Sequence, residues 1–110
     1  MIVLGIDPGL ATVGFGIVKK TGNKYTALDY GVIKTTSKKE VPQRMKDIYD
    51  AIASLIIKYQ PNAIAIEELF FNRNAKSLIN VAQARGVSIL AGLDQCGNIY
   101  EYTPLQIKQG

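Results

Sequence analysis

Apolar and polar residues alternate along the chain with two different periods, which predict strands and helices. Short runs rich in β-branched residues are typical of strands, and two longer segments repeat their apolar residues at helical spacing. The order is three strands, a helix, a strand, a helix and a strand. The predicted strands are residues 2–7, 12–19, 25–35, 63–67 and 99–102, and the predicted helices are residues 41–59 and 75–96.

The connections between these elements predict how the strands pair. Thr21-Gly22-Asn23 is typical of a tight turn, so the first three strands form an antiparallel meander. A strand–helix–strand crossover is almost always right-handed, which brings the fourth strand beside the first. We therefore expect an α/β fold with a five-stranded mixed sheet in the order 3-2-1-4-5, in which strand 2 is antiparallel, and with flanking helices.

The second predicted helix, Ala75–Cys96, is apolar around most of its circumference. Such a helix is buried deeply or on two sides. Because the domain is small, we expect the second side to contact a partner subunit, so that this helix forms a homodimer interface.

Length and composition describe an ordinary globular domain. The chain has 110 residues, of which 47% are hydrophobic and 20% charged, and we expect residues 1–110 to form one domain. Thirteen basic and nine acidic residues give a net charge of +4. This charge mildly favours binding to polyanions. Charge alone does not identify the partner, because many basic domains bind no nucleic acid.

The cysteine and histidine content excludes several kinds of chemistry. With one cysteine, Cys96, no internal disulfide forms, which fits a reducing compartment. With no histidine, Ser-His and Cys-His catalysis are excluded and a zinc site is disfavoured. No apolar stretch is long enough to cross a bilayer, and the first apolar run meets Asp7 too early for a signal peptide. We expect a cytoplasmic protein without membrane contact.

Two acids follow apolar runs at the ends of predicted strands. Asp7 ends the first strand and Glu67 ends the fourth, and these strands are expected to be parallel neighbours about 4.8 Å apart. The two carboxylates could then bind one Mg²⁺ or flank a pair of ions. Three alternatives stay open: Asp7 initiates the turn at Pro8-Gly9, Glu67 begins a solvated loop, or Glu68 is the relevant acid in place of Glu67.

The predicted topology also sorts the basic residues by their distance from Asp7. Lys19, Lys20 and Lys24 lie at the far end of the sheet, about 25 Å away, and we interpret them as solvated charges. Five other cations border the acid pair and form a candidate phosphate-binding rim, although each alone is typical of a solvated surface. These candidate DNA-binding residues are Lys38, Lys39, Arg73, Lys76 and Lys108.

Two adjacent aromatic residues, Phe70-Phe71, follow the glutamates in a predicted loop. Aromatic residues in a loop usually anchor it to the core. Beside a basic rim they could instead stack on an unpaired base or wedge between base pairs.

Several motifs together resemble the RuvC-type Holliday-junction resolvases, over Met1 to about Lys108. The opening motif alone is shared with the wider RNase H-like and actin-like superfamily, whereas the glutamate block followed by Gln-Ala-Arg-Gly is more specific. The motifs are Gly5-Ile-Asp7-Pro-Gly9 with Gly14-Phe-Gly16, then Ala65-Ile-Glu67-Glu68-Leu-Phe70, then Asn74-Ala75 and Gln83-Ala-Arg85-Gly86.

The resemblance implies an RNase H-like fold, a homodimer built largely on the second helix, and Mg²⁺-dependent nicking of two opposite strands at a four-way DNA junction. Two Mg²⁺ ions per site and junction branch-migration proteins as partners are also implied. Asp7 and Glu67 match two catalytic, metal-binding carboxylates of the family. Phe70 matches its junction-contacting aromatic, and Lys108 matches a basic residue near the scissile phosphate.

One departure from the family concerns two further acids, spaced about one helical turn apart on a C-terminal helix. The chain ends at Gln109-Gly110 before any such motif. We therefore expect a domain that lacks the C-terminal helices of the family, binds metal weakly, and cleaves slowly or not at all.

Three other functions compete with this interpretation. An actin-like or sugar-kinase-type phosphotransferase has a similar first hairpin, but usually carries Thr or Ser where Leu10 stands. A non-catalytic DNA-binding dimer is the second. The third is a shorter RuvC-like nuclease acting on RNA precursors, against which the Glu67-Glu68-Leu-Phe70 block argues.

Overall fold

The structure of the chain is a computed structural model that describes residues 1–67 and 75–102, with only the backbone described for residues 75–77 and 102. Each predicted element is present, with ends within two residues of those expected. β2 differs most from its predicted range, ending two residues later than expected, because its pairing with β3 continues to the turn at Gly22, where φ is +62°. The elements are β1 (Ile2–Asp7), β2 (Thr12–Thr21), β3 (Lys24–Lys34), α1 (Val41–Tyr59), β4 (Ala63–Glu67), α2 (Ala75–Gln95) and β5 (Ile99–Tyr102).

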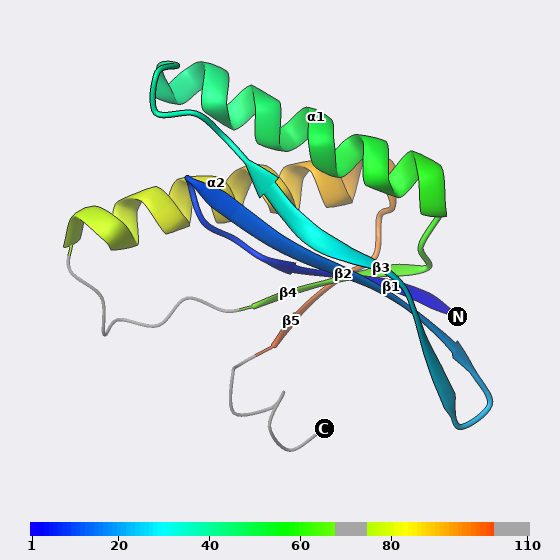
Figure 1. The fold of residues 1–110 in the computed structure, drawn as a ribbon. Coiled ribbons are helices and arrows are strands. Elements are labelled where there is room, and N and C mark those ends of the chain that lie inside the picture. Colours follow the sequence, from blue (N-terminus) through cyan, green and yellow to red (C-terminus); the bar gives the residue numbers. More distant parts are fainter. Residues whose placement is uncertain (68–74, 103–110) are drawn as a thin grey trace.

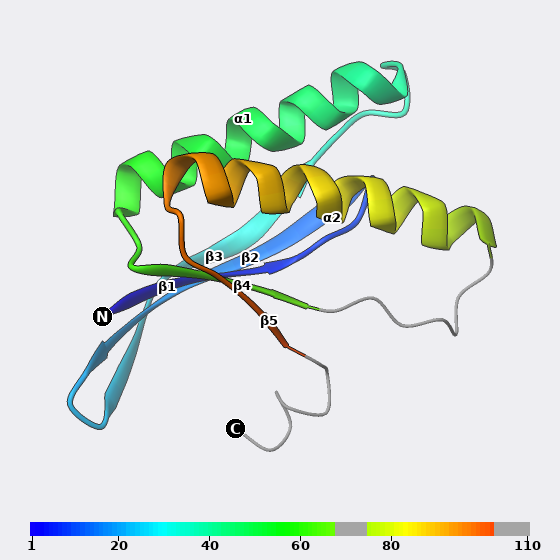
Figure 2. The ribbon, with the colours of Figure 1, turned by 180° about the vertical axis from the view of Figure 1, so that it is seen from behind.

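The five strands form one mixed sheet in the order β3-β2-β1-β4-β5, which confirms the predicted topology. β2 is antiparallel to both β1 and β3, and β1, β4 and β5 run parallel. Figures 1 and 2 show that α1 and α2 lie side by side on the same face of the sheet. The opposite face, which we call the open face, carries no helix among residues 1–67 and 75–102.

The core lies between the two helices and the sheet. Alternate residues of β1 are buried there, so Leu4 and Ile6 face the helices while Gly5 and Asp7 belong to the open face. α2 approaches the sheet closely at Gly92, where a Cβ would lie 3.3 Å from Ile64 Cγ1. The other fully buried large side chains of the core are Val13, Ile17, Ile48, Ile52, Ile64 and Ile66.

α2 buries one side and exposes the other. Ala84, Ser88 and Ala91 are buried, and the Ser88 hydroxyl donates to the Ala84 carbonyl within the helix. Three large apolar side chains on the helix remain more than half exposed. Exposed apolar side chains gathered on one side of a helix are typical of a contact surface. These side chains are Ile79 (58%), Leu90 (52%) and Leu93 (57%).

Within the described ranges, neither helix has the combination of length and hydrophobicity that crossing a membrane requires.

Candidate nuclease site

Asp7 and Glu67 occupy neighbouring positions at the carboxyl ends of two parallel strands. The pairing of β1 with β4 runs up to Ile6 opposite Ile66, and Asp7 and Glu67 are the next residues in this register. Because Ile6 and Ile66 both point into the core, the two acids share the open face, with strand axes about 4.8 Å apart. Asp7 is exposed and Glu67 is half-buried.

Glycines lie beside Asp7 on the side of β2, away from Glu67. Gly14 of β2 is opposite Asp7, and a Cβ placed on Gly14 would lie 3.6 Å from the Asp7 Cβ. Gly16 of β2 is opposite Gly5 of β1 in the adjacent cross-strand pair. The absence of side chains leaves the backbone at the bottom of an open groove of about 480 Å³ beside Asp7.

The loop after Asp7 is held by residues that the sequence did not single out. The Thr35 hydroxyl donates to the Leu10 carbonyl over 2.6 Å, and it accepts from Arg44 Nε over 3.0 Å. A Cβ at Gly9 would overlap the Thr12 carbonyl oxygen, so the loop closes tightly. Asp7 is therefore followed by a turn that is fastened to the end of β3 and the first turns of α1.

Arg85 of α2 fastens the other acid-bearing strand. Its Nε donates to the Glu67 carbonyl over 3.2 Å, and its Nη2 lies 2.6 Å from the Glu101 Oε1 of β5. The Arg85 side chain is only 16% exposed. It joins α2 to the ends of β4 and β5, which fixes the backbone from which the Glu67 carboxylate extends.

Of the five side chains predicted to form the basic rim, the structure describes those of Lys38 and Lys39. The ammonium group of Lys39 lies 2.9 Å from Asp47 of α1, and its hydrogen bond holds the pKa of the Asp47 carboxyl below its ordinary value. The Lys38 side chain is exposed and has no such partner among the described residues. Phe70, Arg73 and Lys108 lie outside the described residues, as does the Lys76 side chain, so their predicted contacts with DNA stay predictions.

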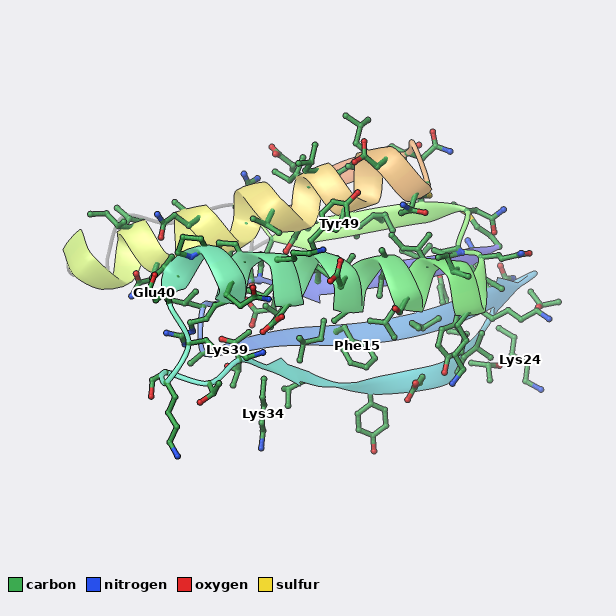
Figure 3. The ribbon with its side chains drawn as sticks, turned by 90° about the horizontal axis from the view of Figure 1, so that it is seen from above. Phe15, Lys24, Lys34, Lys39, Glu40 and Tyr49 are labelled. Atoms are coloured by element: carbon green, nitrogen blue, oxygen red, sulfur yellow. The ribbon has the colours of Figure 1, made fainter. Side chains whose placement is uncertain are left out.

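The lysines predicted to lie far from Asp7 are at the other end of the sheet. Lys20 Nζ lies 5.5 Å from the centre of the Tyr25 ring beside the β2–β3 turn. Figure 3 shows Lys24 at the tip of the same hairpin, at the opposite end of β3 from Lys34. Their exposed positions agree with solvated charges.

The acid pair fits the ligand preference of Mg²⁺. This ion favours oxygen ligands and usually takes one or two carboxylates of the protein, with water and substrate phosphates completing its coordination. Within residues 1–67 and 75–102, no cluster of three or more His, Cys, Asp or Glu side chains forms a fuller metal site. Asp7 and Glu67 are thus suited to an ion that substrate phosphate helps to hold.

Comparison with known proteins assigns the chain to a family. Residues 3–110 match the family model described as crossover junction endodeoxyribonuclease RuvC. The chain belongs to the RuvC family. Relatives carrying the same description include those of Alkaliphilus metalliredigens, 58% identical over 109 residues, and Halothermothrix orenii, 53% identical over 109 residues. Each alignment covers 99% of this chain and 66% of the relative, so the chain spans about two thirds of the length of these RuvC proteins.

Solved structures agree with the RuvC assignment. The RuvC of T. thermophilus in complex with a Holliday junction substrate is 32% identical and has a TM-score of 0.91, over 99% of this chain and 70% of that one. The yeast mitochondrial Holliday junction resolvase Ydc2 is 15% identical, covers 97% of this chain and 54% of that one, and shares the fold with a TM-score of 0.68. These resolvases confirm the predicted RNase H-like fold.

Proposed function

We propose that this protein acts as a metal-dependent endonuclease on four-way DNA junctions, in recombination and repair. The observation that carries the proposal is the register of β1 and β4, which sets Asp7 and Glu67 side by side on one open face. Membership of the RuvC family and the likeness to a RuvC bound to a Holliday junction support the choice of substrate.

Asp7 and Glu67 would hold Mg²⁺ at the ends of their strands, with two ions per site in a complete centre. The chemistry that bound Mg²⁺ supplies is activation of water and stabilisation of the leaving 3′ oxygen. The chain itself orients the two acids. The contacts of Thr35 fix the loop after Asp7, and Arg85 fixes the strand end that carries Glu67.

A homodimer built on α2 would supply the symmetry that the substrate requires. Two related cuts in a four-way junction need two sites related by a two-fold axis. The exposed row Ile79, Leu90 and Leu93 supports α2 as the contact, because these apolar side chains face away from the sheet. Proteins that drive branch migration are further expected partners.

The proposal is tested by assaying nicking of a synthetic four-way junction beside a linear duplex of the same sequence. Two proteins are compared: the 110-residue chain, and an extended chain in which the final third of the Alkaliphilus metalliredigens relative follows Gly110. We expect both to prefer the junction in binding. We expect the extended chain to nick it when Mg²⁺ is present and to stop when EDTA is added.

Two of the alternative functions predict different results. Equal affinity for junction and duplex would contradict the proposal. Junction binding by the extended chain without any metal-dependent nicking would favour a non-catalytic DNA-binding dimer. Tight ATP binding in calorimetry would favour a phosphotransferase, a possibility raised by the fold alone, which the Aquifex aeolicus Ppx/GppA protein shares with 15% identity and a TM-score of 0.54.

Two adjacent lysines provide a matched test of the phosphate-binding rim. Lys39 is already paired with Asp47, whereas the Lys38 ammonium has no partner among the described residues. We therefore expect Lys38→Ala to weaken junction binding more than Lys39→Ala. Loss of one phosphate contact lowers the slope of log affinity against log salt by about 0.9, which a salt titration of each variant measures. Equal slopes in the wild type and Lys38→Ala would remove Lys38 from the rim.

A further inference from the structure

Arg44, in the first turns of α1, lies at the edge of the sheet where β1 ends in Asp7. β1 and β3 are both antiparallel to β2, so they finish at the same edge, and α1 begins there after a short loop. Figure 3 shows Glu40, the residue before α1, at the opposite end of the molecule from Lys24. Because side chains of a helix lean toward its amino end, the Arg44 side chain extends toward this edge, to the Thr35 hydroxyl.

One edge of the Arg44 guanidinium is anchored, and the other has no partner in the described part of the chain. Nε donates to the Thr35 hydroxyl over 3.0 Å, and this hydroxyl donates to the Leu10 carbonyl over 2.6 Å. Thr35 is itself held, because its backbone N–H donates to the Ala11 carbonyl over 3.0 Å. Among residues 1–67 and 75–102, no acceptor lies within hydrogen-bonding distance of Arg44 Nη1 or Nη2, and neither atom is enclosed. Two donors therefore reach solvent from a side chain whose position is fixed.

The charge of Arg44 is not neutralised by the acids of α1. The helix carries two acids, and each is paired with a lysine, Asp47 with Lys39 at 2.9 Å and Asp50 with Lys46 at 3.2 Å. No other acid of the described residues lies within salt-bridge distance of the Arg44 guanidinium. Arg44 thus presents an uncompensated positive charge within this part of the chain.

We propose that Arg44 binds a phosphate of the DNA strand that is cut, through Nη1 and Nη2, while Thr35 holds the guanidinium in place. The planar guanidinium matches two phosphate oxygens with two parallel hydrogen bonds. A side chain that is already fixed loses less conformational freedom when its ligand binds. The inference rests on the proposed function and makes Arg44 a positioning residue, since a guanidinium does not bind a metal ion.

The surroundings of Arg44 select a DNA phosphate as its ligand. The Thr35 hydroxyl that anchors Arg44 also holds Leu10, which follows Asp7 in the same loop. A DNA strand that presents one phosphate to Asp7 carries further phosphates past this loop. Lys38, in the connection between β3 and α1, adds a second exposed cation there.

The test measures binding to a four-way junction over a range of salt concentrations, for the 110-residue chain and for the extended chain. The variants at the site are Arg44→Ala and Arg44→Lys. The matched control is Lys46→Ala, which removes the same charge from an exposed position on the same helix. Thermal unfolding of each variant shows whether the fold is intact.

We expect Arg44→Ala to weaken junction binding about tenfold and to lower the slope of log affinity against log salt by about 0.9. Arg44→Lys should keep the slope, because lysine keeps the charge, but should recover only part of the affinity, because lysine lacks the planar pair of donors. Lys46→Ala should keep the affinity and the slope of the wild type.

Thr35→Val tests the anchor separately. This variant keeps the charge of Arg44 but removes the hydroxyl that accepts from Nε. Arg44→Ala should therefore cost less affinity in the Thr35→Val background than in the wild type, because residues in contact are energetically coupled. Thr35→Ser, which keeps the hydroxyl, should bind the junction like the wild type. Equal losses from Arg44→Ala in the two backgrounds would contradict the role of Thr35.

Three results would overturn the phosphate contact itself. The first is a folded Arg44→Ala with the affinity and salt slope of the wild type. The second is an equal loss in Lys46→Ala, since any charge on α1 would then suffice. The third is a loss that disappears in the extended chain, since the added segment would then cover Arg44. If Arg44→Ala does not fold, Arg44→Lys decides, and wild-type affinity in that variant would contradict the proposal.

These failures are distinct from failure of the proposed function. In each of them the wild type still prefers the junction to the linear duplex, so the proposed function stands. Equal affinity of the wild type for both DNAs would overturn the proposed function, whereas the salt slope of Arg44→Ala on the duplex would still show whether Arg44 contacts a phosphate.

Discussion

Asp7→Asn in the extended chain is expected to lower metal-dependent nicking of a four-way junction by about a thousandfold or more. The amide removes one anionic ligand from a pair on adjacent strands, and the metal contribution to transition-state stabilisation is several kcal/mol, at tenfold per 1.36 kcal/mol. Folding should be unaffected, because Asp7 is exposed and asparagine has nearly the same shape. Nicking rates under single-turnover conditions measure the effect.

Junction binding separates loss of chemistry from loss of structure in this variant. Asp7→Asn should bind the junction at least as tightly as the wild type when no divalent ion is present, because a negative charge next to phosphate has been removed. The matched control is Asp50→Asn, since Asp50 forms an exposed surface pair with Lys46 on α1. A variant that nicks at the wild-type rate would show that Asp7 is not a metal ligand.

Arg85→Ala is expected to have the largest effect on stability among the residues around the site, about 1–3 kcal/mol in the free energy of unfolding. The substitution removes the hydrogen bond to the Glu67 carbonyl and the 2.6 Å ion pair with Glu101, both from a side chain that is largely buried. Because the end of β4 loses its attachment to α2, we also expect weaker Mg²⁺ binding. Urea unfolding and calorimetry measure the two effects.

A surface ion pair provides the comparison for Arg85. The ammonium of Lys46 lies 3.2 Å from Asp50, but both side chains are more than half exposed, so Lys46→Ala should cost no more than about 0.5 kcal/mol. Arg85→Lys should lose part of the effect of Arg85→Ala, since lysine keeps the charge without the two-pronged geometry. An Arg85→Ala variant as stable as Lys46→Ala would mean that α2 and β4 hold together without this contact.

The sheet order was predictable because local signals and topology agreed. The turn at Gly22 sets the antiparallel meander, and the handedness of crossovers then leaves β4 beside β1. The same reasoning brought Asp7 and Glu67 to one edge. The two acids also share a face of the sheet, because Ile6 is in register with Ile66. The sequence does not predict this register, since β4 is apolar on both faces up to Glu67.

Other features of the site depend on contacts between distant segments. Arg85 reaches residues 16 and 18 positions away, and its motif gave a family likeness without a structural role. Lys39 pairs with Asp47, 8 residues further along the chain, a contact that composition alone does not indicate.

The position of β3 at the border of the sheet has a consequence for how the protein behaves in concentrated solution. One side of its backbone has no neighbouring strand among residues 1–67 and 75–102, and an unpaired strand with exposed apolar side chains is a template for pairing with another molecule. Lysines occupy both ends of this strand, Lys24 and Lys34. Their like charges oppose edge-to-edge pairing of β3 strands from two molecules. Lys24 and Lys34 therefore help keep the protein monodisperse.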